Sequence, residues 1–290
     1  MAGELGDDAT AAAAVRTAIA ASVARLITHD APVRLGEDVE GVHQMRVATR
    51  RLRSDLRTFS ELLEPGWVAE LRAELSWLAD LLGGVRDADV LVARLERAVA
   101  TLPGAVQRSS RPLFERLQRD HEAHRDELLS ALRSPRFVTL IDALVDAARA
   151  PRSLDGAQAR AVAALPALVN GPYERLAKAI ADLPRDPPDA ALHELRIRAK
   201  RARYAAEAAA PVIGPRARRF ALAAADLQDV LGEHQDAVVA ADWLATNARG
   251  KAAFAAGWLA AGEAAAARAA AGSWRPVWRR VRARRPSTWT

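Results

Sequence analysis

One basic motif occurs twice in this chain, at positions about 150 residues apart. Residues 43–53 read HQMRVATRRLR, and residues 193–203 read HELRIRAKRAR. A second motif follows each copy: residues 78–88 read LADLLGGVRDA, and residues 227–237 read LQDVLGEHQDA. Because the motifs keep their order and nearly their separation, we predict two copies of one structural unit that present their basic helices to one acidic partner.

The residue pattern predicts an all-α fold. The chain has 290 residues, of which 50% are hydrophobic, and this is enough for a sizeable core. Long stretches consist of Ala, Leu, Arg and Glu, which favour helix, and apolar residues recur at spacings of three and four. Proline and glycine positions predict about nine or ten helices. Two of the predicted breaks fall at Gly83-Gly84 and Gly171-Pro172.

The duplication predicts two similar halves of a single domain that spans residues 1–290. We expect the first helical half at 8–150 and the second at 157–282, with the seam in the Pro151–Gly156 stretch. Residues 283–290 are expected to form a basic tail whose end is disordered, because the C-terminal region is rich in arginine and has no acid.

The repeated basic motif places its cations along one side of a helix. With about 100° of rotation per residue, they form a stripe beside the apolar stripe rather than opposite it. The first stripe contains His43, Arg46, Arg50, Arg53 and Arg57; the second contains His193, Arg196, Lys200 and Arg203, with Glu207 in the last position. Like charges one turn apart repel by a few tenths of a kcal/mol. The stripes therefore predict a bound anion, and the alternative is pairing with acids on neighbouring helices.

The charge balance also favours a polyanionic partner. The net charge is +6, and only three of the 42 basic residues are lysines. Arginine can bind phosphate oxygens in pairs through its planar fork, although a GC-rich genome would produce the same bias. A nucleic acid is the main alternative partner. It is not favoured, because single-strand binders need stacking rings and only Tyr204 lies near the basic motifs.

Several classes of function lack their sequence signatures. The chain has no cysteine, which excludes thiol catalysis and fits a reducing, cytoplasmic compartment. It has no uncharged apolar run of roughly 18 residues, so we expect no membrane association, and the N-terminus does not look like a secretory signal. Walker, HExxH, GxSxG and di-iron signatures are absent. We therefore expect a binder without enzymatic turnover, cofactor or metal.

The aspartates near the second motif leave one enzymatic alternative open, a metal-dependent enzyme that makes or cleaves phosphoanhydrides. Such chemistry needs clustered carboxylates for Mg²⁺. The candidates are Asp80, Asp87, Asp89, Asp229 and Asp236. They lie in segments rich in leucine and glycine, which favours packing and capping roles over catalysis.

These motifs resemble the CHAD domain, the conserved-histidine α-helical domain. The resemblance rests on HxxRVxxRRLR with RDADV in the first half, and on HxLRIxxKRxRY with LQDxLGxxQD in the second. It runs from about Ala11 to Arg282 and implies two pseudo-symmetric four-helix bundles around a basic cradle. Ala202 departs from the usual leucine, which would thin the core contact of its helix. No triphosphate-tunnel domain precedes the helices, so we expect a standalone CHAD protein.

The resemblance also implies a ligand and the residues that bind it. The ligand is inorganic polyphosphate, often in polyphosphate granules with their proteins. Carried over by position, the binding residues are His43, Arg46, Arg50, Arg53, His193, Arg196, Lys200 and Arg203, with Arg57 and Arg198 as extensions.

Overall fold

A computed structural model of the chain describes residues 6, 8–36 and 39–288. This part of the chain forms ten α-helices and four short 3-10 turns, with no β-strand, which confirms the all-α prediction. The helices are α1 (Ala11–Thr28), α2 (Asp30–Leu35), α3 (Val39–Thr58), α4 (Pro65–Ala100), α5 (Gly104–Leu132), α6 (Pro135–Arg149), α7 (Ala161–Ala181), α8 (Asp189–Ile213), α9 (Pro215–Asn247) and α10 (Ala253–Arg282). The 3-10 turns are η1 (Ser60–Leu62), η2 (Asp155–Gln158), η3 (Gly250–Ala252) and η4 (Pro286–Thr288).

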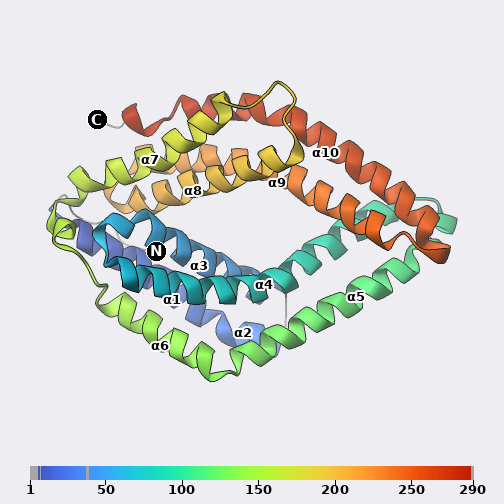
Figure 1. Ribbon diagram of the computed structural model, residues 1–290, viewed down its shortest axis with the longest axis horizontal. Coiled ribbons are helices and arrows are strands. Elements are labelled where there is room, and N and C mark those ends of the chain that lie inside the picture. Colours follow the sequence, from blue (N-terminus) through green and yellow to red (C-terminus); the bar gives the residue numbers. More distant parts are fainter. Residues whose placement is uncertain (1–5, 7, 37–38, 289–290) are drawn as a thin grey trace.

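The two repeats occupy opposite sides of the molecule. In Figure 1, α1 to α6 lie below and α7 to α10 lie above, and the long helices α4, α5, α9 and α10 extend together to the right. Helices in equivalent positions of the repeats contact each other: α1 with α7, α3 with α8, α4 with α9 and α5 with α10. The basic motifs therefore meet where α3 contacts α8. That each half is a pseudo-symmetric four-helix bundle stays a prediction.

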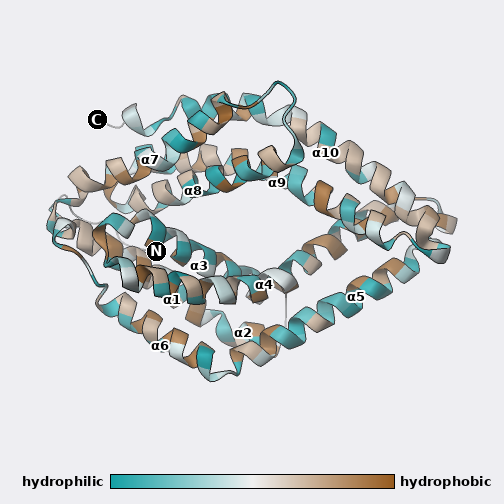
Figure 2. Cartoon of the chain, viewed as in Figure 1, coloured by the Kyte–Doolittle hydropathy of each residue, from teal (hydrophilic) through white to brown (hydrophobic). Residues whose placement is uncertain are grey.

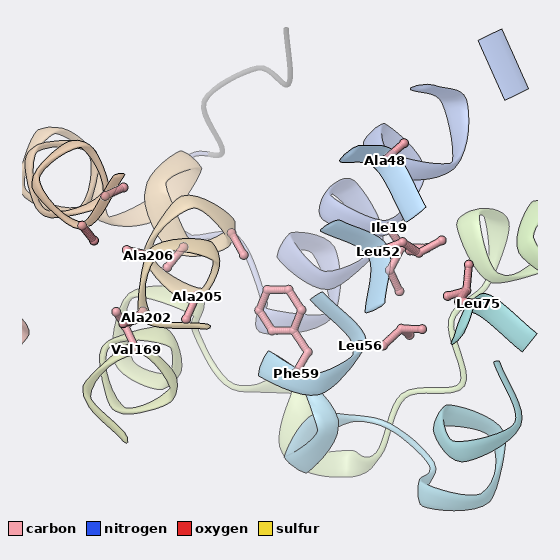
Figure 3. Close-up of a cluster of buried hydrophobic side chains, with 14 of the residues drawn as sticks. Ile19, Ala48, Leu52, Leu56, Phe59, Leu75, Val169, Ala202, Ala205 and Ala206 are labelled. Atoms are coloured by element: carbon pink, nitrogen blue, oxygen red, sulfur yellow. The ribbon is translucent and has the colours of Figure 1, made fainter. Parts of the chain in front are cut away.

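One continuous core joins the two halves. It includes Ile19 of α1 and Leu52 of α3 from the first half, and Ala202 and Ala205 of α8 from the second, all fully buried. Phe59 points from the end of α3 towards the alanine-rich turns of α8 (Figure 3). The small side chains of α8 leave room for this ring. Ala202 itself is fully buried in this core.

Local capping sets the starts of several helices. The Thr10 hydroxyl accepts a hydrogen bond from the Ala13 amide at the start of α1 (3.2 Å). The Ser134 hydroxyl accepts one from the Phe137 amide at the start of α6 (3.3 Å). These side chains satisfy amides that have no partner within the first turn.

Two predicted breaks are wrong. α4 continues through Gly83-Gly84, and α7 continues through Gly171-Pro172. A Cβ added to Gly84 would lie 2.8 Å from Cδ2 of His124 on α5. The glycine therefore allows α5 to pack against α4 and does not end the helix.

In the C-terminal segment, η4 lies against α7 and Pro286 is buried. That the end of the basic tail is disordered stays a prediction. Residues 289 and 290 lie outside the described part of the chain. Hydrophilic residues recur along α5 from end to end (Figure 2).

One segment, Ala11–Leu35, is long and apolar enough to cross a membrane by length and composition alone. Its apolar side chains Val15, Ile19 and Leu26 are fully buried within the protein. In this structure α1 is a core helix that contacts α3, α6, α7 and α8.

Candidate functional site

The two basic stripes come together where α3 contacts α8. We call the combined set the basic cluster: His43, Arg46, Arg50 and Arg53 of α3, and His193, Arg196, Lys200 and Arg203 of α8. Charges on α3 and α8 act on each other, as the pKa values of two of these residues indicate. Burial lowers the pKa of Lys200 to about 7, helped by the positive charges of Arg50, Arg196, Arg46 and Arg53. Burial likewise lowers the pKa of Arg50, with Arg196 and Arg203 of α8 adding to the effect.

Four cations at the centre of the cluster form no ion pair within the described part of the chain. Arg50, Arg53, Arg196 and Lys200 are half-buried, and none of them forms a hydrogen bond or ion pair with residues 6, 8–36 or 39–288. The Nε atom of Arg196 is buried without a hydrogen-bond partner. Buried charges are normally paired. A bound anion would compensate the positive charges of this arrangement.

Cations at the edge of the cluster are paired. Arg46 donates to Asp87 of α4 at 2.9 Å. Arg203 donates to Glu207, one turn later on α8, at 2.8 Å. Glu207 also forms an ion pair with Arg51 of α3 at 2.8 Å, so the acid that replaces the last cation of the second stripe ties α3 to α8.

The repeated glycines have a role in positioning the cluster. A Cβ on Gly83 of α4 would lie 3.9 Å from Arg46, and a Cβ on Gly232 of α9 would lie 3.6 Å from Nε of Arg196. A side chain longer than a methyl group would displace the arginine in either repeat. The nearest neighbours of both glycines are arginine side chains rather than backbone, so each glycine provides space beside a guanidinium.

The two histidines differ in their surroundings. Nδ1 of His193 is 2.7 Å from Oε1 of Gln235 on α9, which leaves Nε2 for a ligand. Burial lowers the pKa of His43, and the positive charge of Arg86 on α4 adds to the effect. Arg86 and Gln235 each directly precede the repeated aspartate of the second motif. The same position of the repeat therefore lies near the histidine of the basic motif in both halves. Sequence reasoning missed both residues, although their place in the repeat was visible.

The two predicted extensions lie outside the cluster centre. Arg57 is exposed, and burial together with Arg201, Arg72 and Arg53 lowers its pKa to about 10. It extends the positive charge towards solvent. Arg198 forms an ion pair with Glu194 on its own helix at 3.0 Å. It lies two residues from Lys200, about 200° around the helix, so the structure does not place it on the stripe.

Tyr204 contacts the cluster as a cation–π partner. It is 8% exposed, with Arg203 5.7 Å and Arg51 6.0 Å from its ring centre. A ring in this position stabilises guanidinium groups, and its burial keeps it from stacking on a base.

The aspartates of the second motif serve different partners. Asp87 accepts from Arg46. Asp89 lies 2.8 Å from Nε2 of His121 on α5, and burial raises its pKa. Burial also raises the pKa of Asp236, against the opposing charges of Arg196 and Arg94. Within residues 6, 8–36 and 39–288, no group of three or more His, Asp or Glu side chains is placed to hold a metal ion.

The fold and the cluster define an all-α protein with a shared cationic site between two repeated helices. Residues 17–245 match the sequence model of the CHAD domain, so the chain belongs to the CHAD domain family, as its motifs predicted. This family is associated with polyphosphate.

The relatives agree with this assignment. Uncharacterized protein Rv2226 of Mycobacterium tuberculosis H37Rv is 36% identical over 246 residues, which are 81% of this chain and 45% of that protein. Protein MT2285 of strain CDC 1551 is 35% identical over the same shares. The chain therefore spans less than half the length of these relatives.

Two solved structures have the same fold. The CHAD domain from the plant Ricinus communis has a TM-score of 0.74 and 29% identity, with 95% of this chain and 96% of that chain covered. PptA from Streptomyces chartreusis has a TM-score of 0.77 and 24% identity, with 93% and 100% covered.

Proposed function

We propose that this protein binds inorganic polyphosphate in the basic cluster between α3 and α8. The observation that carries the proposal is the set of unpaired, half-buried cations at its centre: Arg50, Arg53, Arg196 and Lys200. Polyphosphate is a flexible chain of closely spaced negative charges. One chain can therefore contact cations from both repeats and relieve the repulsion between them.

The side-chain chemistry favours phosphate over other anions. Arginines bind phosphate oxygens through two parallel N–H donors, and most of the cluster is arginine. His193 adds an imidazole whose Nδ1 is engaged by Gln235. The association of the CHAD family with polyphosphate supports the same ligand.

A nucleic acid fits the site less well. Sequence-independent binders of single strands use aromatic rings as stacking platforms. The ring beside the cluster, Tyr204, is buried between Arg51 and Arg203. The cluster therefore offers charge without a platform for bases.

The proposed role is binding, without turnover, in the cytoplasm and at polyphosphate granules. The arginines can neutralise phosphate charge, but phosphoryl transfer also requires a positioned nucleophile. A fluorescent fusion of the full chain tests the location, since it should coincide with granules in cells that accumulate polyphosphate and become diffuse in cells that do not.

The binding proposal is tested by calorimetric titration of the full chain with long-chain polyphosphate and with RNA of matched charge at one salt concentration. Polyphosphate should bind at least about tenfold more tightly, a difference of about 1.4 kcal/mol. A variant with Arg50→Gln and Arg196→Gln should lose most of the affinity. The matched control carries Arg108→Gln and Arg119→Gln on exposed positions of α5 and should retain it. RNA binding as tight as polyphosphate binding would refute the proposal.

A further inference from the structure

Lys200 is chemically different from the other cations of the basic cluster. It is the cluster's one primary amine; the others are guanidinium or imidazole groups. A guanidinium stays protonated in proteins, whereas a lysine can lose its proton and become a nucleophile. The chain's remaining lysines lie elsewhere: Lys178 pairs with Asp182 on the surface of α7 at 3.0 Å, and Lys251 is exposed in η3.

The surroundings of Lys200 favour the neutral amine. Arg46, Arg50 and Arg53 face it from α3, and Arg196 lies one turn earlier on α8. Together with burial, these charges lower the pKa of Lys200 to about 7. The nearby carboxylates are directed to other groups: Asp87 of α4 bonds to Arg46, Asp236 of α9 lies near Arg196 and Arg94, and Glu207 of α8 bonds to Arg203 and Arg51. The amine is thus half-buried beside anion-binding groups, and it forms no ion pair with a carboxylate of the described residues.

We propose that Lys200 is a site of covalent acylation by small acyl phosphates, which the surrounding arginines hold by their phosphate group. This inference rests on the proposed anion-binding role of the cluster. Arg50 and Arg196, which form no ion pair with the described residues, bind the phosphate. Arg196 lies one turn before Lys200 on α8, and side chains at this spacing are neighbours, with about 5–6 Å between their Cβ atoms. An acyl group held by its phosphate at Arg196 would therefore lie beside the Lys200 amine.

The reaction balances without an added reactant. The lone pair of Nζ attacks the carbonyl carbon, and the bond between that carbon and the phosphate oxygen breaks. Inorganic phosphate leaves with the bonding electrons, and the proton lost from nitrogen passes to phosphate or solvent. The products are an amide on Lys200 and free phosphate. The arginines assist by stabilising the negative charge on the leaving group.

Acylation and polyphosphate binding are then mutually exclusive. A bound polyphosphate covers Lys200, and its negative charge favours the protonated amine, which does not react. Acylation in turn removes a positive charge from the centre of the cluster. The modification would therefore lower affinity for polyphosphate.

The experiment treats the ligand-free full chain with acetyl phosphate and measures acetylation of each lysine by peptide mass spectrometry. At pH 7, Lys200 should react at least about tenfold faster than Lys178 or Lys251, because a lysine with an ordinary pKa is almost entirely protonated there. Excess polyphosphate should abolish this preference. Arg50→Gln with Arg196→Gln should reduce it for acetyl phosphate more than for acetic anhydride, which lacks a phosphate group.

The outcomes separate the two proposals, because polyphosphate binding is titrated on the same preparation. Preferential acetylation of Lys200 in a protein that does not bind polyphosphate supports the acylation site and refutes the proposed function. Polyphosphate binding with equal acetylation of all three lysines refutes the acylation site alone. Equal effects of the arginine substitutions on both reagents would also overturn the inference.

Discussion

Replacing Lys200 with methionine is predicted to stabilise the ligand-free protein. Methionine keeps an unbranched side chain and removes the charge. In the folded protein, burial and then Arg50, Arg196, Arg46 and Arg53 lower the pKa of Lys200 from 10.5 to about 7. The unfolded chain therefore binds more protons than the folded chain between these pH values, so the charged lysine opposes folding.

The size of the effect follows from the shift. One pKa unit corresponds to about 1.4 kcal/mol, so the whole shift sets an upper limit of roughly 5 kcal/mol at neutral pH. Solvent screens a half-buried group, and we therefore expect about 1–3 kcal/mol. The pKa of Lys200 is lower in the folded chain than in the unfolded chain. The loss of stability caused by Lys200 is therefore absent above the unfolded pKa near 10.5. It grows as the pH falls towards 7 and stays constant below pH 7.

Thermal unfolding of the wild-type chain and Lys200→Met at pH 7 and pH 10.5 measures this penalty. At pH 7 the variant should melt higher by about 2–4 °C per kcal/mol, and the difference should shrink at pH 10.5. Lys178→Met is the matched control, because Lys178 pairs with Asp182 and its removal should give no gain. A variant with a native circular dichroism spectrum and an unchanged or lower melting temperature at pH 7 would refute the reasoning.

The remaining predictions concern the ligand and the core. Reversing the charge of either half of the cluster should weaken polyphosphate binding at least about 100-fold in a titration, or about 2.7 kcal/mol. The first variant carries Arg46→Glu and Arg50→Glu, and the second carries Arg196→Glu and Lys200→Glu. Unchanged affinity in either variant would exclude a shared site. Affinity should fall steeply as salt rises, by counterion release as in nucleic acids, and a flat salt dependence would count against phosphate contacts. Polyphosphate incubated with the protein and Mg²⁺ should keep its length on gels; phosphate release that Asp80→Asn abolishes would reverse this expectation. Ala202→Leu should destabilise the protein by about 1–3 kcal/mol in urea titration, through overpacking of the core in which Ala202 is fully buried, and a gain in stability would contradict the described packing.

Much of the site was predictable because both copies of the basic motif space their cations in the same way. The helical period alone places Arg46, Arg50 and Arg53 on one side of α3, and Arg196, Lys200 and Arg203 on one side of α8. Helical spacing fixes positions on one helix, but it carries no information on which residues face each other between helices. The approach of Arg50 to Arg196 became visible only in the fold.

The wrong predictions concern a helix break and individual site residues, for which side-chain contacts decided the outcome. Gly83-Gly84 looked like a helix break, yet α4 passes through it because Arg46 and His124 use the space that the missing side chains leave. Arg198 lies within the second basic motif, but its position on the helix directs it to Glu194. Gln235 and Arg86 were not predicted, although each precedes a repeated aspartate in the second motif.

The structure of the full chain crystallised with a short polyphosphate tests the central claim most directly. The account predicts phosphate groups bound between α3 and α8, with oxygens within hydrogen-bonding distance of both Arg50 and Arg196. It would be contradicted by a polyphosphate bound only to one of these helices, or bound instead to the C-terminal arginines of α10 while the basic cluster stays free of phosphate.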